Sequence, residues 1–126
     1  MTLSRRKARR QALFLLYQWD LSGQEIGSQY AGEIDPWARG VAEAVSDRAE
    51  ELDARITGAS EGWTADRLGT VERSALRVAV HELQTGEVPA EVAINEAVAF
   101  TKRYASEDGA RLVNGILGKI QREEAA

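Results

Sequence analysis

The sequence predicts an all-α protein that folds as one compact domain. Apolar residues recur at three- and four-residue spacing along most of the chain, and no segment sustains the two-residue alternation of a half-buried strand. Only two prolines interrupt the 126 residues. A chain of this length supports one core, because two domains would each be near the size at which cores become marginal. We therefore expect residues 1–126 to form a single domain of about six to seven helices.

The first helix is expected from about Ser4, which can cap it, to Leu21. Its apolar face consists of Ala8, Ala12, Leu15, Leu16 and Trp19. The stretch at 22–34 follows and contains three glycines, so we expect a loop with at most a short helix there.

The middle of the chain predicts two long helices joined by a short helical turn. Asp35 caps the first of them, Pro36 takes its first position, and an apolar stripe continues to about Thr57. Thr64 can cap the short turn, which ends at about Leu68. Thr70 can cap a helix over 71–85 that is apolar on most sides, and we expect this helix to lie buried at the centre.

Two more helices complete the predicted fold. One runs over about 90–104, and the other follows the capping residues at 106–108. Asn95 and Asn114 are expected to be buried amides with hydrogen-bond partners, and Gly115 to permit close helix packing. Only the glutamate-rich C-terminus is expected to fray.

Composition excludes several classes of function. The chain has no cysteine, which rules out disulfides, thiolate metal sites and cysteine nucleophiles. The single histidine, His81, has no serine or carboxylate at triad spacing and is expected to be a hydrogen-bonded structural residue. A glycine-rich phosphate loop is also missing. We expect no catalytic activity, no cofactor and no metal, and a cytoplasmic location, because neither an apolar run of membrane-spanning length nor a secretory signal is present.

Charge is distributed unevenly along the sequence. Sixteen basic and 20 acidic residues give a net charge of −4. Residues 1–19 contain five bases and no acid, which leaves 11 bases and 20 acids, a net −9, in the rest of the chain. The bases are Arg5, Arg6, Lys7, Arg9 and Arg10. This polarity predicts a localised contact with a polyanion or an acidic partner.

Helix stability does not explain this basic cluster. Arg5 and Arg9 lie four residues apart, as do Arg6 and Arg10, so each pair is mutually repulsive. Positive charge also opposes the helix dipole at an N-terminus. We therefore expect glutamine substitution of these four arginines to leave stability unchanged or slightly higher. Arginine is suited to RNA binding, because its planar guanidinium group binds phosphates and stacks on bases.

Alternative interpretations of the cluster remain open at this stage. A solubilising basic tail would need no partner, and a membrane-surface helix conflicts with an apolar face that the core requires. Helix-turn-helix DNA binding is disfavoured because Glu91 and Glu96 would face phosphates. Tyr17 can meet a base beside the cluster or lie at the core edge. The three tryptophans are expected in the core or at its rim.

Four motifs occur in order along most of the chain. They are Arg5-Arg6-Lys7-Ala8-Arg9 with Ala12-Leu13 and Leu16-Tyr17; Trp63-Thr64-x-x-Arg67-Leu68 with Val71-Glu72-Arg73-x-x-Leu76-Arg77-x-Ala79-x-x-Glu82-Leu83; Val88-Pro89-x-x-Val92-Ala93-Ile94-Asn95-Glu96-Ala97-Val98; and Glu107-Asp108 leading to Val113-Asn114-Gly115-Ile116-Leu117. Each motif is weak alone, but the ordered set resembles the NusB family of transcription antitermination factors.

The resemblance implies two small helical bundles without catalytic activity. It also implies binding of single-stranded boxA RNA in ribosomal RNA transcripts, together with NusE, a small-subunit ribosomal protein, on elongating RNA polymerase. A homodimer occurs in the family. The same fold occurs in some ribosomal RNA methyltransferases, but we expect a stand-alone factor because the chain has no room for a cofactor-binding domain.

The resemblance assigns site residues position by position. Arg5, Arg6, Lys7, Arg9 and Arg10 match the RNA-binding start, and Asp108 and Leu112 match positions near the RNA surface. Leu112 replaces a common phenylalanine, so an apolar contact is expected there instead of base stacking. Tyr17 and Glu72 match positions at the NusE contact. The competing hypothesis is a purely structural protein, a helical bundle whose basic cluster contacts an acidic protein.

Overall fold

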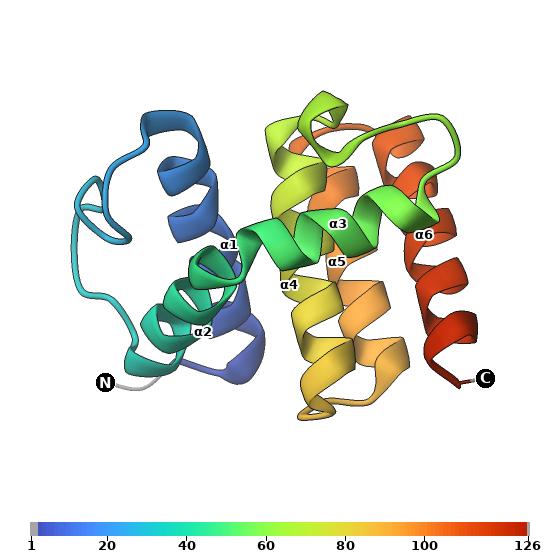
Figure 1. Ribbon diagram of the computed structural model, residues 1–126. Coiled ribbons are helices and arrows are strands. Elements are labelled where there is room, and N and C mark those ends of the chain that lie inside the picture. The colour runs from blue at the N-terminus through green and yellow to red at the C-terminus, as the bar shows by residue number, and fades with distance from the viewer. Residues whose placement is uncertain (1–2, 126) are drawn as a thin grey trace.

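The computed structural model describes residues 3–125, and every regular element in that range is a helix (Figure 1). Its elements are α1 (Arg5–Ser22), α2 (Pro36–Asp47), α3 (Ala49–Ala59), the short 3-10 helix η1 (Ala65–Arg67), α4 (Thr70–Thr85), α5 (Ala90–Tyr104) and α6 (Glu107–Ala125). The predicted all-α class is confirmed. None of the helices in residues 3–125 is long and apolar enough to cross a membrane.

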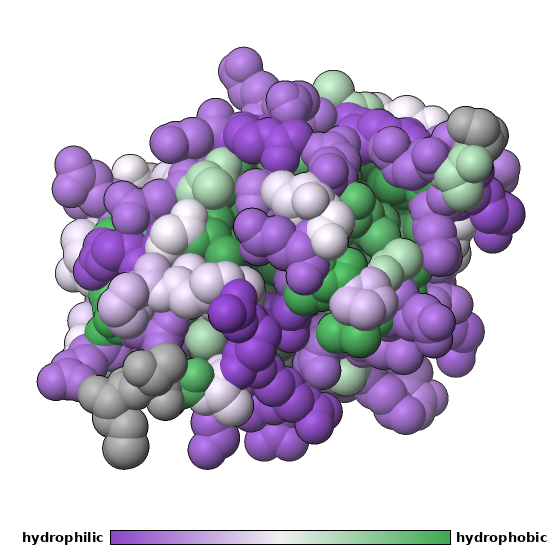
Figure 2. Space-filling model, turned by 90° about the horizontal axis from the view of Figure 1, so that it is seen from below, coloured by the Kyte–Doolittle hydropathy of each residue, from purple (hydrophilic) through white to green (hydrophobic). Residues whose placement is uncertain are grey.

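The helix α4 lies at the centre of the fold, as its sequence predicts. It packs against each of the other five α-helices, and its residues 74–80 are all buried. The pair α1 and α2 packs on one side of it, the pair α5 and α6 packs on the other, and α3 crosses α4 and α6 (Figure 1). Seen from below in Figure 2, the surface is mainly hydrophilic, with hydrophobic side chains visible between the polar ones.

Caps and glycines fix the start and end of α1. The Ser4 hydroxyl accepts a hydrogen bond from the backbone N–H of Lys7, and Gly23 ends the helix with a positive φ of 72°. The segment at 22–34 contains turns and no helix. Gln11 holds this segment against α1, because its amide nitrogen donates to the Tyr30 hydroxyl and to the Glu33 carbonyl.

Asp35 caps α2 and also anchors the start of the chain. Its carboxylate accepts hydrogen bonds from the backbone N–H groups of Leu3, Trp37 and Ala38. Burial disfavours the charged form of Asp35, but these three hydrogen bonds outweigh it and lower the pKa of the carboxyl group below its ordinary value.

The single helix predicted from Pro36 to Thr57 is wrong, because the chain bends at Arg48 into α2 and α3. No glycine or proline marks this position. The bend follows from packing, since α2 lies against α1 while α3 crosses α4 and α6. Arg48 secures the bend by donating to Nδ1 of His81, at 2.8 Å, and to the Glu51 carboxylate. His81 is thus hydrogen-bonded, as predicted.

Several predicted caps and ends differ from the structure. Gly69, and not Thr70, is the N-cap of α4, and Thr64 precedes η1 without a side-chain capping bond. Ser106 caps α6 as predicted, accepting from the Gly109 N–H at 2.9 Å. In the described residues α6 continues to Ala125, and Arg55 of α3 pairs with Glu123 and Glu124 near its end.

Two amides and one glycine are also placed differently from expectation. Asn95 and Asn114 are exposed, and a Cβ at Gly115 would meet no protein atom within 4 Å. Their neighbours Ile94 and Val113 face the core instead. A shift of one helical position turns a side chain by 100°, so the apolar runs around these residues did not reveal which side faces outward.

Candidate nucleic-acid interface

The basic cluster lies in the first two turns of α1, but only four of its five members face solvent. Arg5, Arg6, Lys7 and Arg10 are exposed, whereas Arg9 is 4% exposed. Helical geometry explains the division, because Arg9 follows Ala8 on the side that faces α4, together with Ala12 and Leu16.

Arg9 makes a buried ion pair with Glu82 of α4. The Arg9 Nε atom donates to both carboxylate oxygens, at 3.0 and 3.1 Å, and Nη2 donates to Oε2 at 2.8 Å. Both side chains are 4% exposed. The structure therefore separates Arg9 from the other four bases: its charge is neutralised inside the protein and holds α1 against α4.

The exposed bases are held loosely. The Arg5 guanidinium lies over the ring of Trp37, 4.2 Å from its centroid. Arg6 approaches Glu96 of α5 at 3.4 Å, with 67% of the Arg6 side chain exposed. Contacts of this kind contribute little to stability because water screens them. These side chains consequently stay available to an anionic ligand.

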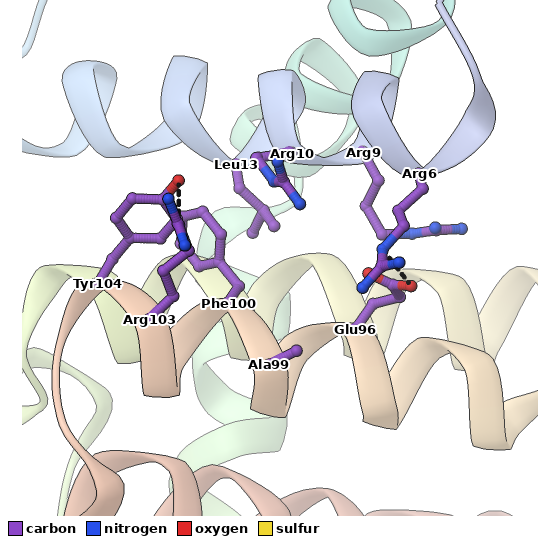
Figure 3. A pocket seen from close by; sticks show the side chains of 9 residues that line it. All are labelled: Arg6, Arg9, Arg10, Leu13, Glu96, Ala99, Phe100, Arg103 and Tyr104. Carbon is purple, nitrogen blue, oxygen red and sulfur yellow. Dashed lines mark hydrogen bonds and ion pairs between the residues drawn. The ribbon is translucent and has the colours of Figure 1, made fainter.

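A hollow of about 200 Å³ lies between α1 and α5, beside these bases (Figure 3). Arg6 and Arg10 of α1 and Arg103 of α5 line it, and Figure 3 shows their guanidinium groups at the space between the two helices. Phe100 and Tyr104 supply aromatic surface in the same hollow. Guanidinium groups next to the exposed Tyr104 ring form a combination suited to phosphates and bases.

Arg103 is the member of this surface that sequence reasoning missed. Its Nε atom donates to the Tyr104 hydroxyl at 3.1 Å, and its guanidinium lies 5.4 Å from the Tyr104 ring centroid. The sequence places Arg103 at the end of a helix, more than 90 residues after the basic cluster. Only the packing of α1 beside α5 brings it next to Arg10, so no local signal reveals it.

Asp108 and Leu112 lie on α6, apart from the α1 bases. The Asp108 side chain is 89% exposed and pairs with Arg111 one turn later. Leu112 is half-buried and packs at the edge of the core. Exposed Lys102 of α5 and Arg111 of α6 line one depression between the two helices, together with Glu107.

Tyr17 and Glu72 lie at the opposite end of α1 from the basic cluster. Asp20, one turn after Tyr17, pairs with Arg73 of α4 at 2.6 Å and so joins the end of α1 to the start of α4. Both Tyr17 and Glu72 are half-buried. The Glu72 carboxylate lies against Gly69 and Gly109, so close that a Cβ at Gly69 would be 2.7 Å from it. The two residues therefore share one end of the molecule.

Among the residues that the structure describes, no three His, Cys, Asp or Glu side chains gather as metal ligands. Burial and the charge of Arg48 lower the pKa of His81, while Glu87 and Glu82 oppose the effect, so His81 is neutral at pH 7 and lies outside the hollow.

Comparison with known proteins identifies the family of this chain. A family model described as NusB matches residues 6–122. The transcription antitermination protein NusB of Rubrobacter xylanophilus is 43% identical, over 91% of this chain and 88% of the relative. The solved NusB of T. maritima has a TM-score of 0.86 at 30% identity, covering 98% of this chain and 94% of that one.

A second solved structure bears on the interface. It is a crystal structure of the antitermination factors NusB and NusE in complex with double-stranded RNA. The chain matched there has a TM-score of 0.81 at 30% identity, covering 94% of this chain and 96% of that chain. The family model and these relatives cover nearly the whole chain, and the chain belongs to the NusB family of transcription antitermination factors, which are not enzymes.

Proposed function

We propose that this protein binds single-stranded boxA RNA of ribosomal RNA transcripts together with NusE, and thereby supports processive transcription by elongating RNA polymerase in the cytoplasm. One observation carries the proposal. Four exposed bases crowd the first two turns of α1, in a chain whose net charge is −4, at a helix end where positive charge is unfavourable. Their arrangement favours a polyanion as partner.

The hollow between α1 and α5 is the centre of the proposed RNA surface. Arg6, Arg10 and Arg103 bind backbone phosphates through their planar guanidinium groups, and Arg5 and Lys7 extend the positive surface toward the N-terminus. Tyr104 offers an exposed ring edge to a nearby base. Arg9 has a structural role in this scheme, because it holds the helix that presents the other bases.

Asp108 and Leu112 extend this surface along α6. An exposed carboxylate can accept hydrogen bonds from the amino groups of a base, which suits Asp108 to base selection. Leu112 offers an apolar side chain to the face of a base. Lys102 and Arg111 line the depression between α5 and α6 and offer further positive charge to the backbone, although each of them also pairs with an exposed acid, Glu107 and Asp108 respectively.

NusE occupies a separate surface in this proposal. Tyr17 and Glu72 lie at the end of the molecule where α1 meets the start of α4, away from the exposed bases. Support comes from the crystal structure of a NusB and NusE with RNA, in which the matched chain is 30% identical to this one. The NusE surface is apart from the bases of α1 and meets the RNA surface only where Glu72 lies against Gly109, beside Asp108, so RNA and NusE can bind next to each other.

The test is a titration of labelled single-stranded boxA RNA with and without NusE. A scrambled strand of equal length and a boxA duplex serve as controls. We expect boxA to bind more tightly than the scrambled strand, NusE to strengthen binding, and the log–log salt slope to be about −3, from about −0.7 for each of four neutralised phosphates. A slope near zero, or binding of an acidic protein with no RNA affinity, would overturn the proposal. Size-exclusion chromatography, run in parallel, shows whether a homodimer masks the RNA surface.

A further inference from the structure

A second groove lies along α6, and of the residues that line it the proposed function uses only Arg111 and Leu112. It has a volume of about 370 Å³ and runs between α6 and the end of α3 with the loop that follows. Trp63, in that loop, lines it and is 50% exposed, so the prediction that all three tryptophans lie in the core or at its rim fails here. Leu112 lines the opposite wall.

Gly115 forms part of the α6 wall of this groove. A glycine in a helix interior destabilises the helix relative to alanine, and it is often retained for close packing. No such packing exists here, because a Cβ at Gly115 would meet no protein atom within 4 Å. The helix backbone therefore stays open to the groove, which leaves room for a flat ligand between Trp63 and Leu112.

The groove is positively charged in a body of opposite charge. Arg111, Lys119 and Arg122 line it, against the single acid Glu61. Neither Lys119 nor Arg122 pairs with a carboxylate within 4.0 Å among residues 3–125. An apolar, aromatic wall with a basic rim suits a ligand that is both planar and anionic.

The groove is also continuous with the proposed RNA path. Arg111 lines both this groove and the depression that Lys102 lines. Arg103, which follows Lys102 in the chain, lines the hollow beside α1. A strand that follows these bases from Arg10 therefore arrives at Trp63. An acidic peptide would satisfy the charge of the groove but would not use the flat indole face.

We propose that the groove between Trp63 and Leu112 is a nucleobase site, in which an unpaired base stacks on the Trp63 indole while Arg111, Lys119 and Arg122 contact the flanking phosphates. The inference rests on the proposed RNA-binding function. Trp63 then supplies the aromatic surface that Leu112 does not. Base stacking on an aromatic side chain tolerates different bases, so this site adds affinity more than sequence selectivity.

The first experiment compares three variants in RNA binding. Trp63→Leu keeps apolar bulk but removes the aromatic face, Trp63→Phe keeps an aromatic face, and Val92→Ala changes an exposed apolar residue outside the groove. With boxA RNA that carries unpaired flanking nucleotides, we expect about tenfold weaker binding for Trp63→Leu, a change within about threefold for Trp63→Phe, and none for Val92→Ala. The salt slope stays at the wild-type value, because no charge changes.

A second measurement uses the native protein and does not depend on the folding of a variant. Exposed Trp63 is accessible to acrylamide, and saturating RNA should protect part of the tryptophan fluorescence from quenching. Subtraction of the Trp63→Phe protein assigns that protection, because Trp19 and Trp37 are unchanged.

The outcomes separate this site from the proposed function. Wild-type protein without RNA affinity refutes the proposed function itself. Wild-type affinity retained by folded Trp63→Leu, or no RNA protection of Trp63, overturns the nucleobase site alone. Loss of NusE affinity in Trp63→Leu with unchanged RNA binding overturns it as well, because the groove would then be a protein contact.

Discussion

Arg9 and Arg10 are neighbours in the sequence, yet they have different surroundings. Arg9 is enclosed between α1 and α4 and pairs with Glu82, whereas Arg10 is exposed at the hollow between α1 and α5. Arg73 and Arg77 of α4 resemble Arg9, since they pair with Asp20 and Asp53 inside the fold. The role of an arginine in this protein therefore depends on whether its side chain is enclosed with a carboxylate between helices, and not on its membership of a basic run.

The enclosed and the exposed arginines should also differ in how much they contribute to folding stability. Removing one member of a buried ion pair leaves an uncompensated charge in the interior, which costs about 3–5 kcal/mol. An exposed pair such as that of Arg6 with Glu96 contributes about 0–1 kcal/mol, because solvent screens it. Stability measurements can therefore separate the two kinds without any RNA.

The largest expected effect is on folding stability, in Arg9→Gln. We expect it to lower the free energy of unfolding by about 3–5 kcal/mol, since Glu82 is left buried without its partner. Arg10→Gln is the matched control and should change the free energy of unfolding by no more than about 0.5 kcal/mol. Urea unfolding followed by circular dichroism measures both. This corrects the expectation from sequence that all four arginines can be replaced without loss of stability.

A double substitution tests whether the unpaired charge causes this loss of stability. Replacing Arg9 by Met and Glu82 by Leu together removes both charges and keeps apolar volume, so much of the lost stability should return. If Arg9→Gln alone is as stable as the wild type, the buried ion pair does not hold α1 in place, and Arg9 belongs with the exposed bases.

The next effect concerns the exposed bases of α1. A variant with Arg5, Arg6 and Arg10 all replaced by Gln retains the buried Arg9 pair and should keep its stability. Its RNA affinity at about 0.15 M salt should fall about 50-fold, or about 2.4 kcal/mol, if three phosphate contacts are lost. The salt slope should change from about −3 to about −1. Fluorescence anisotropy at several salt concentrations measures both quantities, and an unchanged slope would place the phosphate contacts elsewhere.

A smaller effect is expected at the proposed NusE surface. Glu72→Lys puts a cation where a basic ribosomal protein is proposed to dock, and should weaken NusE binding at least tenfold, about 1.4 kcal/mol. RNA affinity without NusE should hold or rise slightly. Glu50→Lys is a matched control, because Glu50 is also an acid in the first turn of a helix and is exposed. Calorimetric titration with circular dichroism decides the question, and unchanged NusE affinity in folded Glu72→Lys would remove Glu72 from the contact.

Local sequence signals predicted most of the fold. Asp35 and Pro36 marked the start of α2, Ser4 and Gly23 marked the two ends of α1, and the apolar run of α4 indicated its central place. Each signal acts within a few residues, so it can be recognised without knowing the tertiary structure. The bend at Arg48 has no such signal, because it depends on α3 turning to cross α4 and α6.

The candidate site was predictable only in part, for the same reason. The basic residues of α1 stand out in sequence, but the inward direction of Arg9 depends on Glu82, 73 residues away. Arg103 joins the surface only through helix packing, and the exposure of Trp63 depends on how the loop before η1 lies on α6. Pairings between distant elements are the part that one sequence does not specify locally.

The smallest expected effect is at Arg48, a half-buried arginine that donates to the neutral imidazole of His81 as well as to the Glu51 carboxylate. Burial and then Arg48 lower the pKa of His81 below its ordinary value of 6.5, although Glu87 and Glu82 oppose the shift. The unfolded chain therefore binds a proton at higher pH than the folded protein does. It follows that the stability contributed by neutral His81 is present above about pH 6.5 and is lost as pH falls through the lowered pKa.

Urea unfolding between pH 7.5 and pH 5 should show this loss in the wild type, and His81→Gln, which keeps a hydrogen-bond acceptor for Arg48, should lose less stability over the same range. Equal pH dependence in both proteins would show that the pKa of His81 is the same in the folded and unfolded states, and that other groups determine any loss of stability over this range.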